Sequence, residues 1–423
     1  MDLSGALGST LRSARVNAAI AWVFLLGVCV VAGRNALAGR LAWAGFASAF
    51  VVVALVPPVA FRDVTVMLPW EVLSIAALSL AGRILLSGGP GQLLAGYVAV
   101  AAFALVVAVE LHVFTAIRMT DWFAVAFVVV TTLATAGLWA VCQWLFAAVL
   151  DTAFVAGLRP LMIQFTGATV AGVGAGVVFS LYFRRAGAAD SRYDPPVRPR
   201  DPTPVSDRPS PRLRDRFGVS ERHEQRFIRA LQLVLVGLFG LGLVLGNLGV
   251  VVNCGIALVV TQLPAVLERD YELAVDPGLA LWVTMAVSVH GLGSLGPYET
   301  IWWWDVVAHT LSASVVAAIG YTTVQVLVEH TDDVFVPPRV LRLFVVLFVV
   351  AAGVFWEVIE FLVGEFTDLA GTGDVLVQYG LEDTMQDLLF DIVGGLLVAL
   401  WGTSPLRPTV DDLTRWLDQR RRE

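Results

Sequence analysis

The sequence predicts an all-α protein: a polytopic transmembrane helical bundle of about 12 spans, in two halves joined by a disordered linker. Of its 423 residues, 57% are hydrophobic and only 15% are charged, whereas a soluble domain carries roughly 25% charged residues. Its apolar runs reach the roughly 20 residues that a helix needs to cross a bilayer. These runs lack the period-2 alternation of barrel strands, which favours helices.

Six spans are predicted in each half of the chain. In the first half they cover residues 16–33, 41–61, 68–86, 92–114, 122–147 and 160–183. In the second half they cover residues 227–245, 248–266, 277–293, 302–326, 340–363 and 384–401. The third and the ninth fit the pattern least well, because Glu71 and Arg83 interrupt the third and the ninth is short.

The predicted domains follow from these runs and from the segments between them. Residues 1–183 form an N-terminal six-span membrane domain, and residues 227–402 form a C-terminal one. Residues 184–226, rich in proline and arginine, are predicted to be a disordered linker. Residues 403–423 are predicted to be a basic amphipathic tail, as a helix on the membrane surface or an exposed capped helix.

Arginine counting predicts the orientation. The chain has no lysine, and the predicted spans put 24 of its 28 arginines on the side of both termini and the linker. Positive charge stays on the cytoplasmic side, so we expect a multi-pass protein of the cytoplasmic membrane with both termini and the linker in the cytoplasm. The net charge of -7 in a lysine-free chain is typical of a halophile-like source and argues against nucleic acid as a partner.

Ionisable side chains gather in the last three predicted spans and point to a functional site. Residues three or four apart share a helix face, so each pair in this set lies on one face. The candidate ligands of a cation or proton site are Asp305, His309, Glu357, Glu360, Asp387 and Asp391. The supporting candidates are His290, Tyr298, Trp356 and Asp383. In the predicted topology all of these groups lie toward the outer leaflet.

Several carboxylates at close range in a low dielectric cannot all stay ionised without a proton or a cation among them. Oxygen ligands with one or two imidazoles suit a divalent metal ion such as Ca²⁺, Mg²⁺, Mn²⁺ or Zn²⁺. A relay of carboxylates suits Na⁺ or H⁺ coupling. The structural alternative is that the carboxylates cap helices and bond to Trp304, Trp356 and Thr384, with Asp383 as an N-cap.

Three functions remain open at this point. The first is a transporter or cation-coupled carrier for a small molecule. The second is a membrane-embedded, metal-dependent enzyme acting on lipid or isoprenoid-phosphate headgroups, with Glu360 or Asp391 as general base. The third is a scaffold in which the polar cluster locks three helices together. The sequence contains no P-loop, GxSxG, HExxH or Rossmann glycine pattern, and the metal, the catalytic residues and the oligomeric state stay open.

A short internal similarity links the fourth and fifth spans to the ninth and tenth. An offset of five spans would place two copies in opposite orientations, as in transporters built from inverted repeats.

The C-terminal half contains four motifs in order: VHGLGSLGPYE, WWDVVAHTLSASVVA, FWEVIEF and EDTMQDLLFDIVGG. Through them, residues 227–402 resemble the YjdF-like family of uncharacterised integral membrane proteins. The resemblance implies that the site lies at the acidic, histidine and tryptophan positions of these motifs. A looser similarity is to VanZ-like membrane proteins, whose Glu-x-x-Gln and Asp-x-x-x-Asn details are missing here, so it implies no resistance role.

Overall fold

The computed structural model describes residues 14–420 except 87, 116, 118, 151–156, 187–220, 274, 332–333, 372–374, 377 and 403–404. The described chain forms an all-α helical bundle, which confirms the predicted fold class. Most of the predicted linker lies outside the described residues. Its two ends, 184–186 and 221–226, are helical and extend the neighbouring helices.

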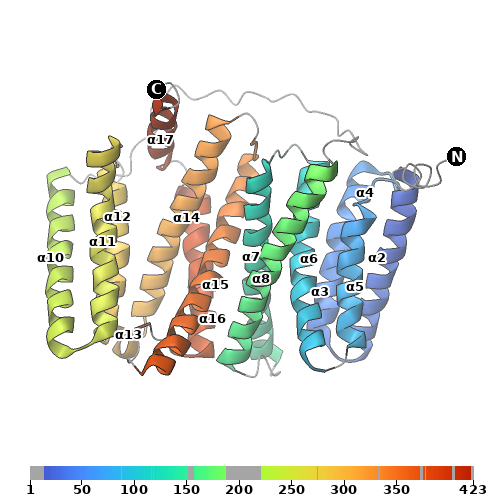
Figure 1. Ribbon diagram of the computed structural model, residues 1–423, viewed down its shortest axis with the longest axis horizontal. Helices are drawn as coiled ribbons and strands as arrows, with labels where there is room; N and C mark the ends of the chain where they lie inside the picture. The colour runs from blue at the N-terminus through green and yellow to red at the C-terminus, as the bar shows by residue number, and fades with distance from the viewer. Residues whose placement is uncertain are drawn as a thin grey trace. The chain divides into compact units, whose positions relative to one another are not determined.

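The helices fall into two compact units, which Figure 1 shows as sets of long helices. Unit one contains α2 to α8. Its helices are α2 (Ala14–Leu37), α3 (Leu41–Ala54), α4 (Val56–Phe61), α5 (Trp70–Leu85), α6 (Pro90–Phe114), α7 (Asp121–Leu150) and α8 (Leu158–Ala186). Two prolines, Pro57 and Pro58, lie in the first turn of α4, which follows α3 after a single intervening residue. Proline is tolerated there because the first turn of a helix has no intrahelical partner for its N–H groups.

Unit two contains α10 to α17. Its helices are α10 (Glu221–Leu245), α11 (Leu248–Tyr271), α12 (Pro277–Gly293), α13 (Pro297–Thr300), α14 (Trp304–His330), α15 (Pro338–Ala370), α16 (Leu381–Leu397) and α17 (Arg407–Arg420), with a π turn (Val398–Gly402) after α16. Asn247 and Asp276 cap α11 and α12 by accepting hydrogen bonds from backbone N–H groups of the first turn.

Ten helical segments of the described chain are long and apolar enough to cross a membrane, counting α3 together with α4 and α16 together with the π turn that follows it. The predicted third and ninth spans do not reach that length, because α5 has 16 residues and α12 has 17. Both are nevertheless helices at the predicted places, and buried side chains pack one face of each.

The two units repeat one pattern of helix packing. In unit one, α2 packs on α3 and α5, α5 on α6, and α6, α7 and α8 on one another. In unit two, α10 packs on α11 and α12, α12 on α14, and α14, α15 and α16 on one another. The units differ in that α11 also packs on α12, while α3 touches α6. The packing therefore repeats with an offset of six spans, and the short helices α5 and α12 correspond.

The predicted offset of five spans does not describe this packing. The helices that correspond in the two units are six spans apart, so the packing gives no support to the predicted inverted repeat.

The C-terminal helix α17 packs against the end of α14. Arg407 forms an ion pair with Glu329 at 2.6 Å, His330 Nδ1 lies 2.9 Å from an oxygen of Asp418, and the indole N–H of Trp416 donates to the carbonyl of Tyr271. Val410, which belongs to α17, is fully buried. The apolar face of this predicted amphipathic helix is thus turned partly toward the bundle.

Candidate functional site

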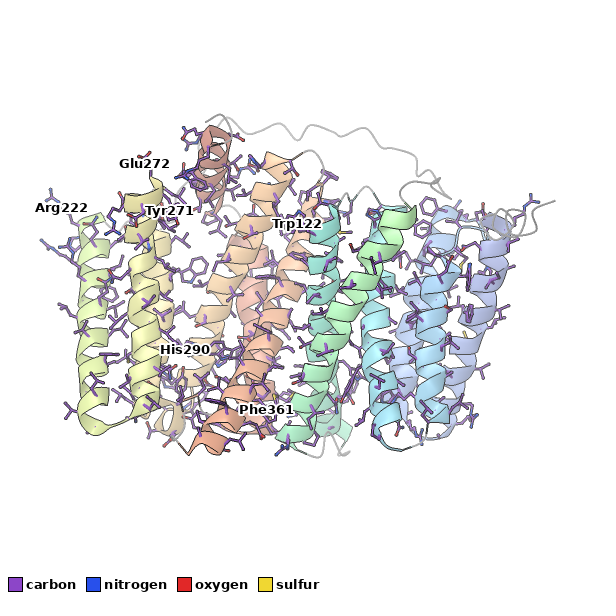
Figure 2. All side chains as sticks on the ribbon, viewed as in Figure 1. Trp122, Arg222, Tyr271, Glu272, His290 and Phe361 are labelled. Atoms are coloured by element: carbon purple, nitrogen blue, oxygen red, sulfur yellow. The ribbon has the colours of Figure 1, made fainter. Side chains whose placement is uncertain are left out.

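The candidate residues meet at one end of unit two. This end contains the last turn of α12, the short helix α13, the first turns of α14 and α16, and a middle turn of α15. Figure 2 shows His290 near this end, and Tyr271 and Glu272 near the opposite one. The structure therefore brings together side chains from five helices, and the first and last of these residues, His290 and Asp391, are about a hundred positions apart in the sequence.

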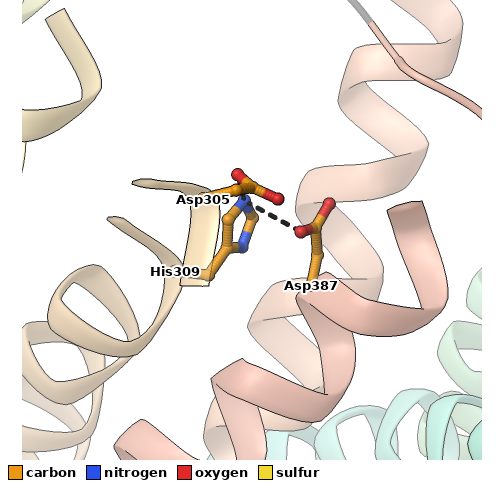
Figure 3. A group of neighbouring side chains, drawn as sticks. All are labelled: Asp305, His309 and Asp387. Carbon is orange, nitrogen blue, oxygen red and sulfur yellow. Dashed lines mark ion pairs between the residues drawn. The ribbon is translucent and has the colours of Figure 1, made fainter. Parts of the chain in front are cut away.

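His309 is the centre of the site. Its Nε2 atom lies 3.6 Å from an oxygen of Asp305 and 3.5 Å from an oxygen of Asp387, as Figure 3 shows. Its Nδ1 atom lies 3.4 Å from an oxygen of Asp391. One ligand atom each from Asp305, His309 and Asp387 lie within 4.8 Å of one another. One imidazole thus has two carboxylates on one nitrogen and a third on the other.

Helical spacing produces this arrangement. Asp305 and His309 are four residues apart on α14, and Asp387 and Asp391 are four apart on α16, so each pair shares one face. The two helices come close because Gly394 lies against the α14 backbone, where a Cβ atom would meet the carbonyl oxygen of Thr310 at 2.5 Å. A small residue at this point allows the close backbone approach.

Asp391 is positioned in a similar way by α15. Its carboxylate lies against Gly353, where any Cβ atom would collide with it. Asp391 is only 8% exposed. Gly353 therefore leaves room for this carboxylate beside His309, and a larger residue there would displace it.

Asp387 has the least satisfied carboxylate of the site. The residue is 6% exposed, and its Oδ1 atom is buried without a hydrogen-bond partner among the described residues. That oxygen is the one that faces His309. A buried carboxylate without a partner is costly unless a proton or cation compensates it. The position between Asp305, His309 and Asp387 is where such a positive charge would be stabilised.

Glu357 has a different role from the open carboxylates. It is 2% exposed, and its Oε2 atom accepts hydrogen bonds of 2.8 Å from Thr384 Oγ1 and from Gln378 Nε2. Gln378 also donates to the backbone carbonyl of Glu357. These bonds tie α15 to α16 and to the segment before α16. For this residue the structure supports the structural alternative, because its partners are protein groups.

We expect Thr384→Val to destabilise the protein by about 1–3 kcal/mol, because it removes a donor to a buried carboxylate. Thermal unfolding in detergent measures this. The matched control is Thr284→Val, since Thr284 is equally buried but its hydroxyl bonds only to Ala280 of its own helix. Equal effects of the two substitutions would contradict a special role for the Glu357 bonds.

Glu360 and Asp383 lie farther from His309. Glu360 accepts a hydrogen bond of 2.9 Å from the indole N–H of Trp356, four residues earlier on α15. Asp383 lies in the first turn of α16, whose N-cap is Gly380. The prediction that Asp383 is an N-cap is therefore wrong: it lies three positions after the N-cap residue, and it lines a cavity instead.

His290 and Tyr298 form a pair beside the centre of the site. The Tyr298 hydroxyl lies 2.5 Å from His290 Nδ1, and the His290 ring stands edge-on to the His309 ring with 5.7 Å between centroids. Nearby, the indole N–H of Trp304 donates to the carbonyl of Val289. The structural alternative had suggested that Trp304 bonds to a carboxylate. In the structure its indole N–H bonds to a backbone carbonyl instead.

A cavity of about 280 Å³ opens beside these groups. It is lined by most of the predicted residues, including both histidines, Asp305 and Asp387. The sequence analysis missed Asn253, Glu299 and Tyr379, which also line it. Asn253 lies in the second turn of α11, Glu299 in the short α13 and Tyr379 in the connection before α16. No ionisable residue lies three or four positions from Asn253 or Glu299, and Tyr379 lies outside a helix, where no helical period applies.

These features define the class of the chain: it is a multi-pass helical membrane protein with a cluster of carboxylates and histidines among its apolar helices. Residues 227–407 match the family described as predicted membrane protein (DUF2238), and the chain belongs to this family. This range includes every candidate site residue and coincides with the motifs that resemble the YjdF-like family. The VanZ-like resemblance stays a prediction.

Two further comparisons describe parts of the chain. An uncharacterized protein of Thermotoga maritima is 30% identical over 182 residues, which are 42% of this chain and 88% of the relative. Residues 5–67 match a second family, described as a domain of unknown function (DUF8268). No solved structure matches the chain.

Proposed function

We propose that this membrane protein binds a divalent metal ion between Asp305, His309 and Asp387. The observation that carries the proposal is the convergence of two carboxylates on His309 Nε2 at 3.5 and 3.6 Å. Nitrogen and oxygen ligands about 2.1 Å from one tetrahedral ion stand roughly 3.4 Å apart. The two distances from His309 Nε2 therefore fit a common ion, and the set of one imidazole and two carboxylates suits Mn²⁺ or Zn²⁺.

The other side of the imidazole supports the same assignment. A histidine that binds a metal through one nitrogen usually donates its other N–H to a carboxylate or carbonyl. In this protein Asp391 lies 3.4 Å from Nδ1, in position to fix the tautomer and leave Nε2 for the metal. We therefore treat Asp391 as a positioning residue and Asp305, His309 and Asp387 as the ligands.

The membrane setting favours a carrier for the ion, or one that couples the ion to a second substrate. The site lies on helices that can span the bilayer and adjoins a cavity, and the six-span packing pattern occurs twice, as in transporters with internal repeats. With the termini in the cytoplasm, as the arginine distribution predicts, the cavity faces the outside.

A metal-dependent enzyme is the second candidate, because the cavity leaves space for a substrate beside the ion. The described part of the cavity lining includes no arginine, and the chain has no lysine. A phosphate headgroup would therefore depend on the metal alone to hold it. This argues against the lipid phosphate and isoprenoid phosphate substrates that the sequence analysis considered.

Thermal unfolding of the chelator-treated protein in detergent tests metal binding. We expect Mn²⁺ or Zn²⁺ to raise Tm in a saturable way, and Na⁺ at matched ionic strength to leave it unchanged. A Tm that responds only to Na⁺ or only to pH would contradict the metal assignment and indicate that the site binds a monovalent ion or a proton. Uptake of Mn²⁺ into proteoliposomes then tests the carrier: metal binding without any flux would favour the enzyme.

The predicted orientation is tested by labelling Ser294→Cys, which lines the cavity. In a background with Cys29, Cys142 and Cys254 replaced by alanine, we expect a membrane-impermeant maleimide to label this cysteine in intact cells. Labelling only after the cells are opened would show that the cavity faces the cytoplasm, which contradicts the predicted orientation.

A further inference from the structure

The cavity beside the proposed metal site carries more negative charge than one divalent ion can balance. Among the described residues its lining includes five carboxylates and no arginine; the carboxylates are Glu299, Asp305, Glu360, Asp383 and Asp387. A divalent ion compensates two charges. Glu299 is exposed, whereas Glu360 and Asp383 are partly buried, so further positive charge in the cavity would stabilise these two in ionised form.

The lining also offers acceptors more readily than donors. Asn253 Nδ2 donates to the carbonyl of Gly249 at 2.9 Å, and the Ser294 hydroxyl donates to the carbonyl of Gly291 at 2.8 Å. The indole N–H of Trp356 is bonded to Glu360, and the Tyr298 hydroxyl is paired with His290. These four donors are used within the protein, so the cavity presents carboxylate oxygens more than free donors and favours a positively charged ligand.

Aromatic rings supply the remaining wall. Tyr298 and Tyr379 stand with ring centroids 6.5 Å apart, and Trp356 lines the same cavity. Tyrosine phenols are neutral at pH 7, because their ordinary pKa is about 10, so the ring faces of Tyr298 and Tyr379 can receive a cation.

We propose that the cavity binds an organic ammonium group, from a free amine or from an amine-bearing lipid headgroup, next to the metal ion. Carboxylates and aromatic rings together are the surroundings that recognise such cations. Glu360, oriented by Trp356, and Asp383 are the carboxylates closest to this role, because neither belongs to the His309 group. This inference rests on the proposed function and extends it by naming the class of its organic substrate.

Tetramethylammonium is the probe, and tert-butanol is its neutral counterpart of similar size. With the full chain in detergent, we expect tetramethylammonium to raise Tm in a saturable way, both with Mn²⁺ and after chelation, and tert-butanol and inorganic phosphate to have no effect. Equal responses to tetramethylammonium and tert-butanol, or none to either, would overturn the ammonium site. A second bound equivalent of Mn²⁺ that excludes the ammonium ion would also overturn it.

The double variant Glu360→Gln with Asp383→Asn tests the assigned residues. We expect its apparent affinity for tetramethylammonium to fall at least about tenfold, because two negative charges near the bound cation are lost, while a Mn²⁺-dependent rise in Tm is still present. Asp368→Asn, at the exposed end of α15, is the matched control and should respond like the wild type. An unaltered ammonium response in the double variant would refute the assignment.

The two proposals fail separately in this design. A Tm rise with Mn²⁺ but none with tetramethylammonium would support the metal site and refute the ammonium site. A Tm rise with tetramethylammonium but none with Mn²⁺ would support the ammonium site and refute the metal site. Nanodiscs of phosphatidylethanolamine and of phosphatidylglycerol identify the source of the ammonium group. Competition by phosphatidylethanolamine alone indicates a lipid headgroup, and equal responses in both lipids indicate a free amine.

Discussion

Asp387→Asn is expected to abolish the rise in Tm with Mn²⁺ and to lower the affinity for the ion by at least about 100-fold. Changes next to a metal ligand already cost about 10- to 100-fold, and this substitution removes a charged ligand itself. Asparagine keeps the size of the side chain, so packing against α14 is preserved. Isothermal titration of the chelated protein with Mn²⁺ measures the loss.

The stability of the metal-free variant separates a metal site from a structural lock. If a cation normally balances these carboxylates, the chelated Asp387→Asn protein should be at least as stable as the chelated wild type, because one unpaired buried charge is gone. A scaffold would instead lose stability with or without metal. Asp368→Asn, which is exposed at the end of α15, is the control and should change neither quantity.

Gly394→Ala is expected to be the most destabilising single-methyl change in unit two. The added Cβ would stand 2.5 Å from the Thr310 carbonyl and 2.8 Å from the Cβ of Ala313. Backbone atoms of a packed helix cannot yield easily, so α14 and α16 must separate. Overpacking of this kind costs about 1–3 kcal/mol, and the separation should also weaken Mn²⁺ binding, since the proposed ligands lie on these two helices.

Gly364→Ala is the control for this experiment. Gly364 lies inside α15, and a Cβ there would meet nothing within 4 Å. Removing a glycine from a helix interior stabilises by about 0.5–1 kcal/mol, so the control should unfold at an equal or higher temperature. A mild effect of Gly394→Ala, comparable to the control, would show that the helix contact can relax.

The sequence predicted the helices well because they depend on local periods, and the same periods brought candidate residues onto shared faces. Apolar length located the spans, and four-residue steps put Asp305 with His309 and Asp387 with Asp391. The predicted helix boundaries were less accurate where a helix continues beyond its apolar stretch into polar residues. The span predicted to end at 363 continues to Ala370 in α15, since a helix can keep its hydrogen bonds after it has left the apolar region.

The different hydrogen-bonding environments of the carboxylates could not be predicted from the sequence. Glu357 and Asp387 look alike in sequence, yet one is bonded to Gln378 and Thr384 and the other has a buried oxygen without a hydrogen-bond partner among the described residues. The difference depends on the path of the segment before α16, which no local pattern encodes. The same segment brings Tyr379 to the cavity.

The repeated packing pattern has a consequence for stoichiometry. In the six-span correspondence, α6 and α8 of unit one match α14 and α16 of unit two. The first halves of α6 and α8, PGQLLAGYVAVA and LRPLMIQFTGATV, contain neither acidic residues nor histidine. The copy in unit one therefore lacks the means to hold an ion in the equivalent place. A chain built from two similar halves should bind a single metal ion, and the first half is free to have diverged toward another task.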